Sequence, residues 1–161
     1  MPKKLLLVED EALIAMVESR MLEKHGYEVV TVYSGEQAID AAETQSIDLI
    51  LMDVDLGTGK MDGTEAAQAI LSRRNIPIVF LSSHTEPEVV EKTEKITAYG
   101  YVVKNSGETV LINSIKMAFK LYKSFRKEQE HEEFLDAIIS ASPVSIFAID
   151  PDGRVILWNE S

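Results

Sequence analysis

Short apolar runs alternate five times with longer amphipathic stretches, and this alternation restricts the folds that the chain can adopt. The runs cover residues 5–8, 28–32, 47–52, 77–81 and 101–103. The stretches between and after them, which have the apolar spacing of helices, cover residues 11–25, 35–44, 64–74, 86–97 and those from about 107 onward. Strands that alternate with helices predict an α/β fold, a five-stranded parallel sheet with helices on both faces. Right-handed crossovers leave few strand orders open.

The length and composition fit one globular domain with a smaller appendage. The chain has 161 residues, of which 45% are hydrophobic and 27% are charged. No stretch of about 18 apolar residues is present, so we expect no transmembrane helix. The apolar run that follows the basic start is too short for a signal peptide. Because the sequence holds no cysteine, we expect a cytoplasmic chain without disulfide or thiolate chemistry.

The charge balance argues against one class of partner and favours another. A formal net charge of -11 disfavours direct nucleic-acid binding, because phosphates are met by clustered Lys and Arg side chains. The same excess of carboxylates leaves ligands available for a hard cation.

Polar side chains follow four of the five predicted strands. They are Glu9 and Asp10 after the first strand, Asp53 after the third, Ser82 after the fourth and Lys104 after the fifth. Because ligands bind beyond the carboxyl ends of the strands in such sheets, we expect these groups to meet at one edge. Each of them alone is explained as a helix cap or a turn residue, but together they indicate a functional site.

Three carboxylates at one edge favour a metal site. They would repel one another, and a divalent cation removes that repulsion. Oxygen ligands without nearby His or Cys suit Mg²⁺. Mg²⁺ beside a carboxylate, an ammonium and a hydroxyl is typical of phosphoryl transfer, in which a carboxylate can act as the nucleophile. Asp53 is the best candidate for that nucleophile, because it stands at the tip of the most apolar strand.

The order and spacing of Glu9-Asp10, Asp53, Ser82 and Lys104 resemble the response-regulator receiver domain of two-component signalling, over roughly residues 3–125. The resemblance implies a flavodoxin-like fold with strand order 2-1-3-4-5. It implies that Asp53 accepts a phosphoryl group from a phosphohistidine on a sensor histidine kinase or a phosphotransfer protein. Mg²⁺ would be bound by Asp10, Asp53 and the backbone carbonyl of Asp55, and Glu9 would assist through water.

The same resemblance assigns roles to the residues around the acceptor. Lys104 would contact the phosphoryl oxygens, Ser82 would bond one of them and move inward, and Tyr101 would follow as the aromatic switch. Asp55 and His84, two residues beyond Asp53 and Ser82, would set the lifetime of the phosphoryl group. Simpler alternatives stay open: Tyr101 as a residue packed on the core, and Asp55 and His84 as solvated loop residues.

The sequence departs from the family pattern at two places. The family usually has Pro after the lysine, joined to it by a cis bond, whereas this chain has Asn105. A cis bond before a residue other than proline costs about 3 kcal/mol. The bond is therefore either cis and strained to aim Lys104, or trans with a different loop, and we favour cis. The loop of residues 56–63 is also two residues longer than usual, which would reshape the kinase-docking surface.

No Gly or Pro interrupts residues 109–142, which predicts one continuous helix that leaves the domain. Ile115, Ala118, Tyr122 and Phe125 fall at the 3-4 spacing of a coiled-coil seam. Both a solvated linker helix and a dimer-forming signalling helix fit this pattern. Our hypothesis is a homodimer, formed through this helix or through the face of the fourth helix, fifth strand and fifth helix.

The last residues predict a β-hairpin, with strands at 144–149 and 154–158 and a turn at 150–153. Residues 141–159 resemble the opening of a PAS domain but amount to only a fraction of one. We therefore divide the chain into a receiver domain (1–125), a helical linker (126–140) and an incomplete PAS domain (141–161). We expect it to belong to a longer receiver–PAS protein, such as a hybrid histidine kinase.

Three functions compete. The first is a phospho-acceptor switch that controls a downstream PAS or output module and is not a turnover enzyme. The second is a Mg²⁺-dependent phosphatase of the haloacid-dehalogenase type, because Asp53-Val54-Asp55 echoes its DxD motif. That motif normally follows the first strand, whereas here it follows the third. The third is a pseudo-receiver that serves only as a dimerisation scaffold, which the intact set of polar groups disfavours.

Overall fold

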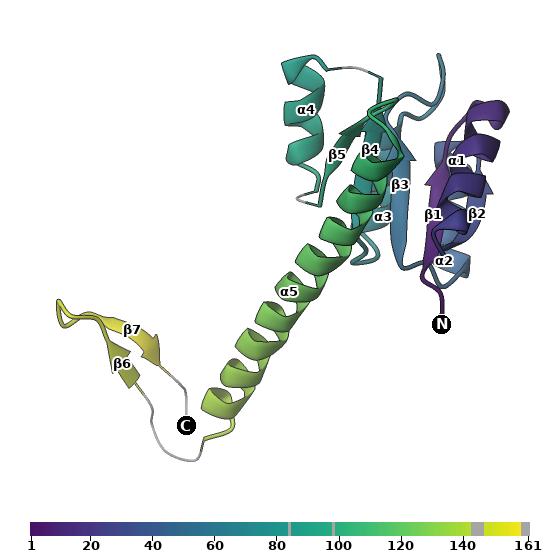
Figure 1. Ribbon diagram of the computed structural model, residues 1–161. Coiled ribbons are helices and arrows are strands. Elements are labelled where there is room, and N and C mark those ends of the chain that lie inside the picture. The colour runs from purple at the N-terminus through teal and green to yellow at the C-terminus, as the bar shows by residue number, and fades with distance from the viewer. Residues whose placement is uncertain (84, 98, 143–146, 159–161) are drawn as a thin grey trace. The chain divides into compact units, whose positions relative to one another are not determined.

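The main sheet has five parallel strands in the order β2-β1-β3-β4-β5 (Figure 1). The computed structural model describes residues 1–83, 85–97, 99–142 and 147–158. The strands are β1 (Lys4–Val8), β2 (Glu28–Val32), β3 (Leu49–Asp53), β4 (Ile78–Ser82) and β5 (Tyr101–Val103). The predicted α/β fold and the strand order implied by the resemblance are both confirmed, and the predicted strand bounds differ from these by at most two residues.

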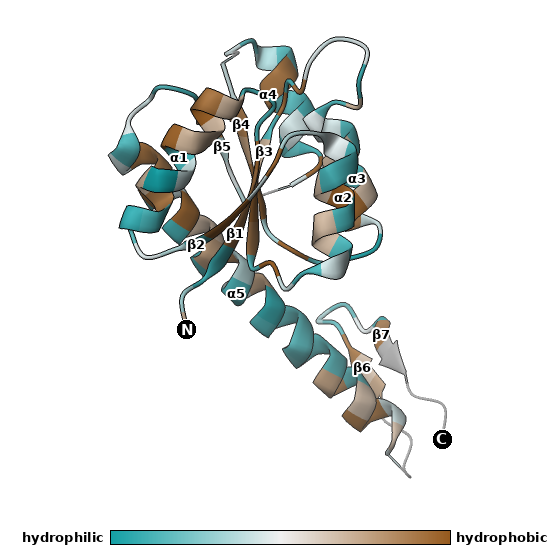
Figure 2. Ribbon diagram, turned by 90° about the vertical axis from the view of Figure 1, so that its right-hand side faces the viewer, coloured by the Kyte–Doolittle hydropathy of each residue, from teal (hydrophilic) through white to brown (hydrophobic). Residues whose placement is uncertain are grey.

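Helices cover both faces of this sheet. They are α1 (Ala12–Lys24), α2 (Gly35–Thr44), α3 (Gly63–Leu71), α4 (Pro87–Glu94) and the long α5 (Glu108–Ser140). The alanine-rich inner faces of α2 and α3 pack against one side of the sheet, whereas α1 and the first turns of α5 pack against the other. Figure 2 shows the apolar strands enclosed between these two layers.

The strands bury both of their faces. Leu5 and Leu7 belong to the core layer on the side of α1 and α5, and Leu6 and Val8 belong to the layer on the side of α2 and α3. All five residues of β3 are buried, as expected for a parallel sheet that is covered on both faces. The central strands therefore hold the residues at their carboxyl ends in fixed positions.

The strand register aligns those carboxyl ends. β1 and β3 pair up to Val8 and Met52, and β4 and β5 pair up to Ser82 and Val103. The segments that follow β1, β3, β4 and β5 consequently start at the same edge of the sheet.

The start of α5 corrects the prediction of a coiled-coil seam. Ile115 and Ala118 are fully buried in the core. The Tyr122 hydroxyl donates a hydrogen bond of 2.9 Å to the backbone oxygen of Asn75. Ile115 and Ala118 pack against the sheet, since the 3-4 spacing of a coiled coil is also the spacing of a helix that lies on a sheet. Among the helices in the described part of the chain, none is long and apolar enough to cross a membrane.

The chain divides into two compact units, residues 1–122 and 123–161. The second unit contains the remainder of α5 and an antiparallel hairpin of β6 (Phe147–Ile149) and β7 (Val155–Trp158). The Asp150 carboxylate accepts hydrogen bonds from the backbone N–H groups of Asp152 and Arg154 and so fixes the turn. The predicted hairpin is confirmed, although part of its predicted first strand, residues 144–146, lies outside the described residues.

Candidate functional site

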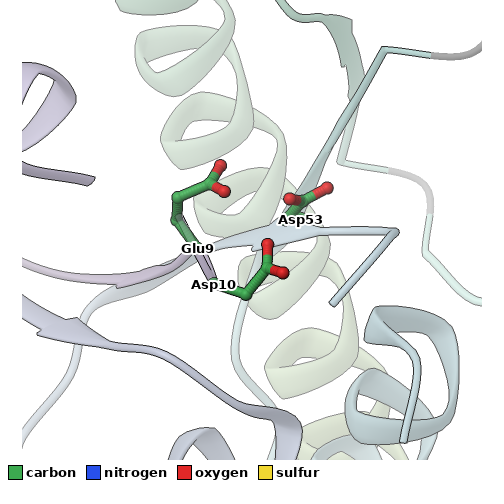
Figure 3. Close-up of side chains that lie close together, drawn as sticks. All are labelled: Glu9, Asp10 and Asp53. Atoms are coloured by element: carbon green, nitrogen blue, oxygen red, sulfur yellow. The ribbon is translucent and has the colours of Figure 1, made fainter. Parts of the chain in front are cut away.

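Three carboxylates from two neighbouring strand ends converge at the sheet edge (Figure 3). Glu9, Asp10 and Asp53 each offer a carboxylate oxygen, and these oxygens all lie within 4.8 Å of one another. Glu9 and Asp53 are buried, with exposed fractions of 0% and 3%. The predicted convergence of these three residues is therefore present in the structure.

Lys104 connects two of these carboxylates. Its Nζ atom donates to Glu9 Oε2 at 2.5 Å and to Asp53 Oδ2 at 2.7 Å. The backbone N–H of Lys104 donates to the Ser82 carbonyl at 2.8 Å, which extends the pairing of β4 and β5 by one residue. The ladder thus sets the direction in which Lys104 leaves the sheet. The ammonium offsets part of the repulsion between the two buried carboxylates.

Burial dominates the electrostatics of the site. It raises the pKa of Asp53 to about 6, with Lys104 opposing the shift and the charge of Glu9 adding to it. Burial alone would lower the pKa of Lys104, but its hydrogen bonds to Asp53 and Glu9 raise that pKa above its usual range. The site therefore holds more negative charge than one lysine can compensate, which is the condition that favours a divalent cation.

A cavity of about 220 Å³ opens beside the Asp53 carboxylate. Asp10, Asp53 and Lys104 line it together with residues of the β3–α3 loop and of the segment after β4, namely Asp55, Gly57, Thr58 and Ser83. The backbone N–H of Asp55 donates to Asp53 Oδ1 at 3.1 Å, whereas the Asp55 side chain is exposed. The walls are mostly polar and acidic, which suits a cation and a group carried on it.

A glycine allows the backbone to close tightly behind Asp53. A Cβ atom at Gly63 would lie 1.8 Å from the backbone oxygen of Asp53, so no larger residue fits there. The N–H of Gly63 donates to the Val54 carbonyl at 2.9 Å. Asp62 and Glu65 form a capping box that starts α3 at this glycine. The loop of residues 56–63 is thus closed at its end by contacts with Asp53 and Val54.

The bond after Lys104 corrects the prediction of a cis peptide. No cis bond occurs among the described residues, so Lys104 and Asn105 are joined in trans. Asn105 instead takes a φ of 63°, in the left-handed region that asparagine tolerates better than most residues. The loop after Lys104 thus takes a trans bond and a left-handed Asn105, which is the second of the two alternatives left open by the sequence.

Ser82 is the last residue of β4 and Tyr101 the first of β5, and His84 lies outside the described residues. Ser82 is fully buried at the end of β4. Tyr101 is half-buried on β5 and packs against the core layer of α2 and α3. It also lines a cavity of about 330 Å³ with Thr93 and Thr97, which belong to α4 and the segment after it.

The sequence analysis missed Glu18. This residue of α1 is half-buried, and its Oε2 atom is shielded from solvent without a hydrogen-bond partner. Burial raises its pKa to about 7, and the charges of Glu9 and Asp53 add to the shift while Lys104 opposes it. A signal was present, because Glu18 interrupts an apolar helical stripe that includes Ile14 and Met21.

Comparisons with known proteins agree with this geometry. Residues 5–116 match the family model of the response regulator receiver domain. The transcriptional regulatory protein PdtaR of Mycobacterium tuberculosis is 37% identical over 123 residues, which are 76% of this chain. The chain spans 59% of the length of that curated relative.

Two solved structures resemble the receiver unit. The N-terminal domain of a response regulator/sensory box/GGDEF 3-domain protein from Carboxydothermus hydrogenoformans is 46% identical, with a TM-score of 0.69, and the match covers 76% of this chain and 98% of that one. The chemotaxis protein CheY4 of Vibrio cholerae is 28% identical, with a TM-score of 0.68, and the match covers 73% and 99%. The chain therefore belongs to the response regulator receiver domain family.

Proposed function

We propose that the chain is a Mg²⁺-dependent phospho-acceptor whose acceptor is Asp53. An oxygen of the Asp53 carboxylate attacks the phosphorus of a phosphohistidine, the P–N bond breaks, and the imidazole leaves with the electron pair and takes up a proton. The product is an aspartyl phosphate. The observation that carries the proposal is the contact of buried Asp53 with Lys104 at 2.7 Å beside two further carboxylates.

The residues at this edge of the sheet have two proposed roles, stabilisation of the transferred phosphoryl group and binding of Mg²⁺. Lys104 stands next to the attacking oxygen, where its ammonium stabilises charge on the transferred group. Asp10, Asp53 and the backbone carbonyl of Asp55 would bind Mg²⁺, and Glu9 would assist through water. Bound Mg²⁺ would neutralise phosphoryl oxygens and relieve the repulsion among the carboxylates. The acidity of the cluster and the absence of His from its members fit that ion.

Ser82 and Tyr101 are the proposed switch. Ser82 would move inward to form a hydrogen bond with a phosphoryl oxygen. Tyr101 would then move into the space that Ser82 leaves. Tyr101 already borders a cavity next to α4, so its ring has room to change position without unpacking the sheet. The resulting change would alter the surface formed by α4, β5 and α5.

The proposed donor is a sensor histidine kinase or a phosphotransfer protein. The helix that follows Asp10 offers a docking surface, because Leu13, Met16 and Val17 of α1 are 75%, 45% and 64% exposed. Apolar side chains gathered on one exposed helix face favour contact with another protein. Their position beside the acidic edge suits a partner that presents a phosphohistidine to Asp53. As a phospho-acceptor for such a donor, the chain would act in the cytoplasm.

The second unit is proposed to be a helical linker (126–140) followed by the start of a PAS domain (141–161). The hairpin exposes Phe147, Ile149 and Ile156 by 60%, 56% and 66%, and such a surface suits further packing within a larger domain or between copies. The relative from Carboxydothermus hydrogenoformans has a sensory box in the same chain as its receiver, which supports this arrangement.

Labelling with acetyl phosphate tests the proposal. We expect one slowly decaying phosphate per chain, dependent on Mg²⁺ and lost in Asp53→Asn. The control is Asp40→Asn, which removes an exposed carboxylate from α2 and should label normally. Labelling that persists in Asp53→Asn, or steady hydrolysis of a phosphomonoester, would contradict a phospho-acceptor at this residue.

A further inference from the structure

A second cavity shares Lys104 with the acidic site. It has a volume of about 320 Å³ and lies between α1 and the segment that joins β5 to α5. Most of its walls are apolar, formed by Val17, Met21, Leu81, Val102 and Leu111. Glu18, Lys104 and Glu108 are the charged residues that face it.

Only one of these charged groups lacks a partner among the described residues. Lys104 is paired with Glu9 and Asp53. Glu108 is paired with His25 at 2.5 Å. Glu18 has a buried Oε2 atom that accepts no hydrogen bond, and a buried acceptor without a donor is costly. Glu18 therefore lines a mostly apolar cavity and carries a carboxylate oxygen that has no hydrogen-bond partner among the described residues.

We propose that this cavity receives a lysine or arginine side chain of the protein that donates the phosphoryl group, with the cationic end bound to Glu18. The stem of such a side chain suits the apolar walls, and its charged end forms a charge-assisted hydrogen bond with a carboxylate. The inference deepens the proposed function, because it names a feature of the phosphodonor that this chain selects.

A protein side chain fits better than a free cation. Val17 lines the cavity and also belongs to the exposed apolar surface of α1 with Leu13 and Met16. A partner that covers those apolar residues would bring its own side chains to the mouth of the cavity. A free metal ion would gain nothing from that surface, since it offers no apolar area to bury.

A titration followed by amide NMR shifts tests the cation site. The probes are n-butylguanidinium and n-butylurea, which have the same stem and differ in charge. Saturating Mg²⁺ keeps the acidic cavity occupied, and the buffer is held above the pKa of Glu18. We expect saturable shifts in residues 17–21 and 102–108 with n-butylguanidinium and none with n-butylurea. Glu18→Gln should weaken the affinity at least tenfold, which is about 1.4 kcal/mol, and the exposed Glu23→Gln on the same helix should not.

Equal responses to the two probes, or an undiminished affinity in Glu18→Gln, would overturn the cation site. No phosphodonor is present in this titration, so a negative result would say nothing against phosphorylation of Asp53. Likewise, a failure of Asp53 to label would say nothing against the cation site.

The second experiment tests whether the cation belongs to the phosphodonor. It uses the histidine kinase of the same genome that labels Asp53 fastest. Glu18→Gln should lower kcat/KM for that kinase at least tenfold more than for acetyl phosphate. An equal loss with both donors would contradict docking, because it would show that Glu18 affects the reaction at Asp53 itself, through the position of Lys104.

Discussion

Charge is concentrated on a few buried side chains at the sheet edge. Glu9 and Asp53 share one ammonium, whereas Glu18 Oε2 has no hydrogen-bond partner in the described part of the chain. Buried carboxylates in such number are tolerated when a function requires them. Their titration and their response to cations can be measured on the chain alone.

Mg²⁺ should stabilise the protein through Asp53. A ligand that binds only the folded state adds stability with its concentration, about 2.7 kcal/mol at a hundredfold excess over Kd. We expect the melting temperature to rise with Mg²⁺ in the parent chain and in Asp40→Asn, and to stay nearly constant in Asp53→Asn. Thermal unfolding with and without Mg²⁺ is the measurement. An unchanged response in Asp53→Asn would exclude this residue as a ligand.

Glu18 should make the protein less stable as the pH rises. Burial raises its pKa from 4.5 to about 7, so between these values the folded state holds a proton that the unfolded chain releases. The free energy of unfolding therefore falls across this window. Asp53, whose pKa is raised to about 6, contributes to the same fall, so Glu18→Gln should make the fall shallower without abolishing it, and should stabilise the chain by about 1 kcal/mol above pH 7. Urea unfolding across the window measures this, with Glu23→Gln as the control, and identical slopes in parent and Glu18→Gln would refute it.

At the scale of elements, the β3–α3 loop is held against β3 by the close approach of Gly63 to the backbone oxygen of Asp53. Gly63 leaves no space for a Cβ atom beside the backbone oxygen of Asp53. The loop returns to the sheet at this point and begins α3 through the Asp62 cap. A change at Gly63 should therefore displace the backbone of Asp53.

Gly63→Ala should destabilise the chain by about 3 kcal/mol and slow labelling of Asp53. The matched control is Gly59→Ala, because Gly59 has a positive φ of 74° but nothing within 4 Å of its added Cβ. That variant should lose only about 1 kcal/mol from backbone strain. Chemical unfolding of both variants gives the comparison, and equal losses would show that the contact with Asp53 does not matter.

Periodicity and strand-end chemistry predicted the elements and the acidic edge, because both depend on local sequence pattern and on the geometry of parallel sheets. The peptide after Lys104 was not predicted correctly, since asparagine offers a left-handed alternative to a cis bond. The seam of α5 was wrong for Ile115 and Ala118, because the same spacing serves a helix on a sheet. Glu18 was missed because its importance comes from groups distant in sequence.

At the scale of the whole molecule, the two units should be separable. Residues 1–122 contain the sheet, both core layers and the complete acidic edge. A chain that ends at Tyr122 keeps the contacts of that residue with Asn75 and Tyr99. We expect it to fold and to take up phosphate from acetyl phosphate as the full chain does.

Self-association should require the activated state. In sedimentation we expect the full chain to form dimers with beryllofluoride and Mg²⁺, and to be largely monomeric without them. The chain ending at Tyr122 distinguishes two routes. Dimers of this shorter chain would assign the contact to the α4, β5 and α5 face, and their absence would assign it to the remainder of the long helix. A monomer under all conditions would contradict dimerisation.

Lys104 lines both the acidic cavity and the apolar one beside Glu18. The two cavities become thermodynamically linked if an occupant of one shifts this amine and so changes the affinity of the other. Linkage is reciprocal, so the factor by which a docked donor changes affinity for the phosphoryl group equals the factor by which the phosphoryl group changes affinity for the donor. If phosphorylation shifts the amine so that donor binding weakens, the same step that phosphorylates the chain also favours release of the donor.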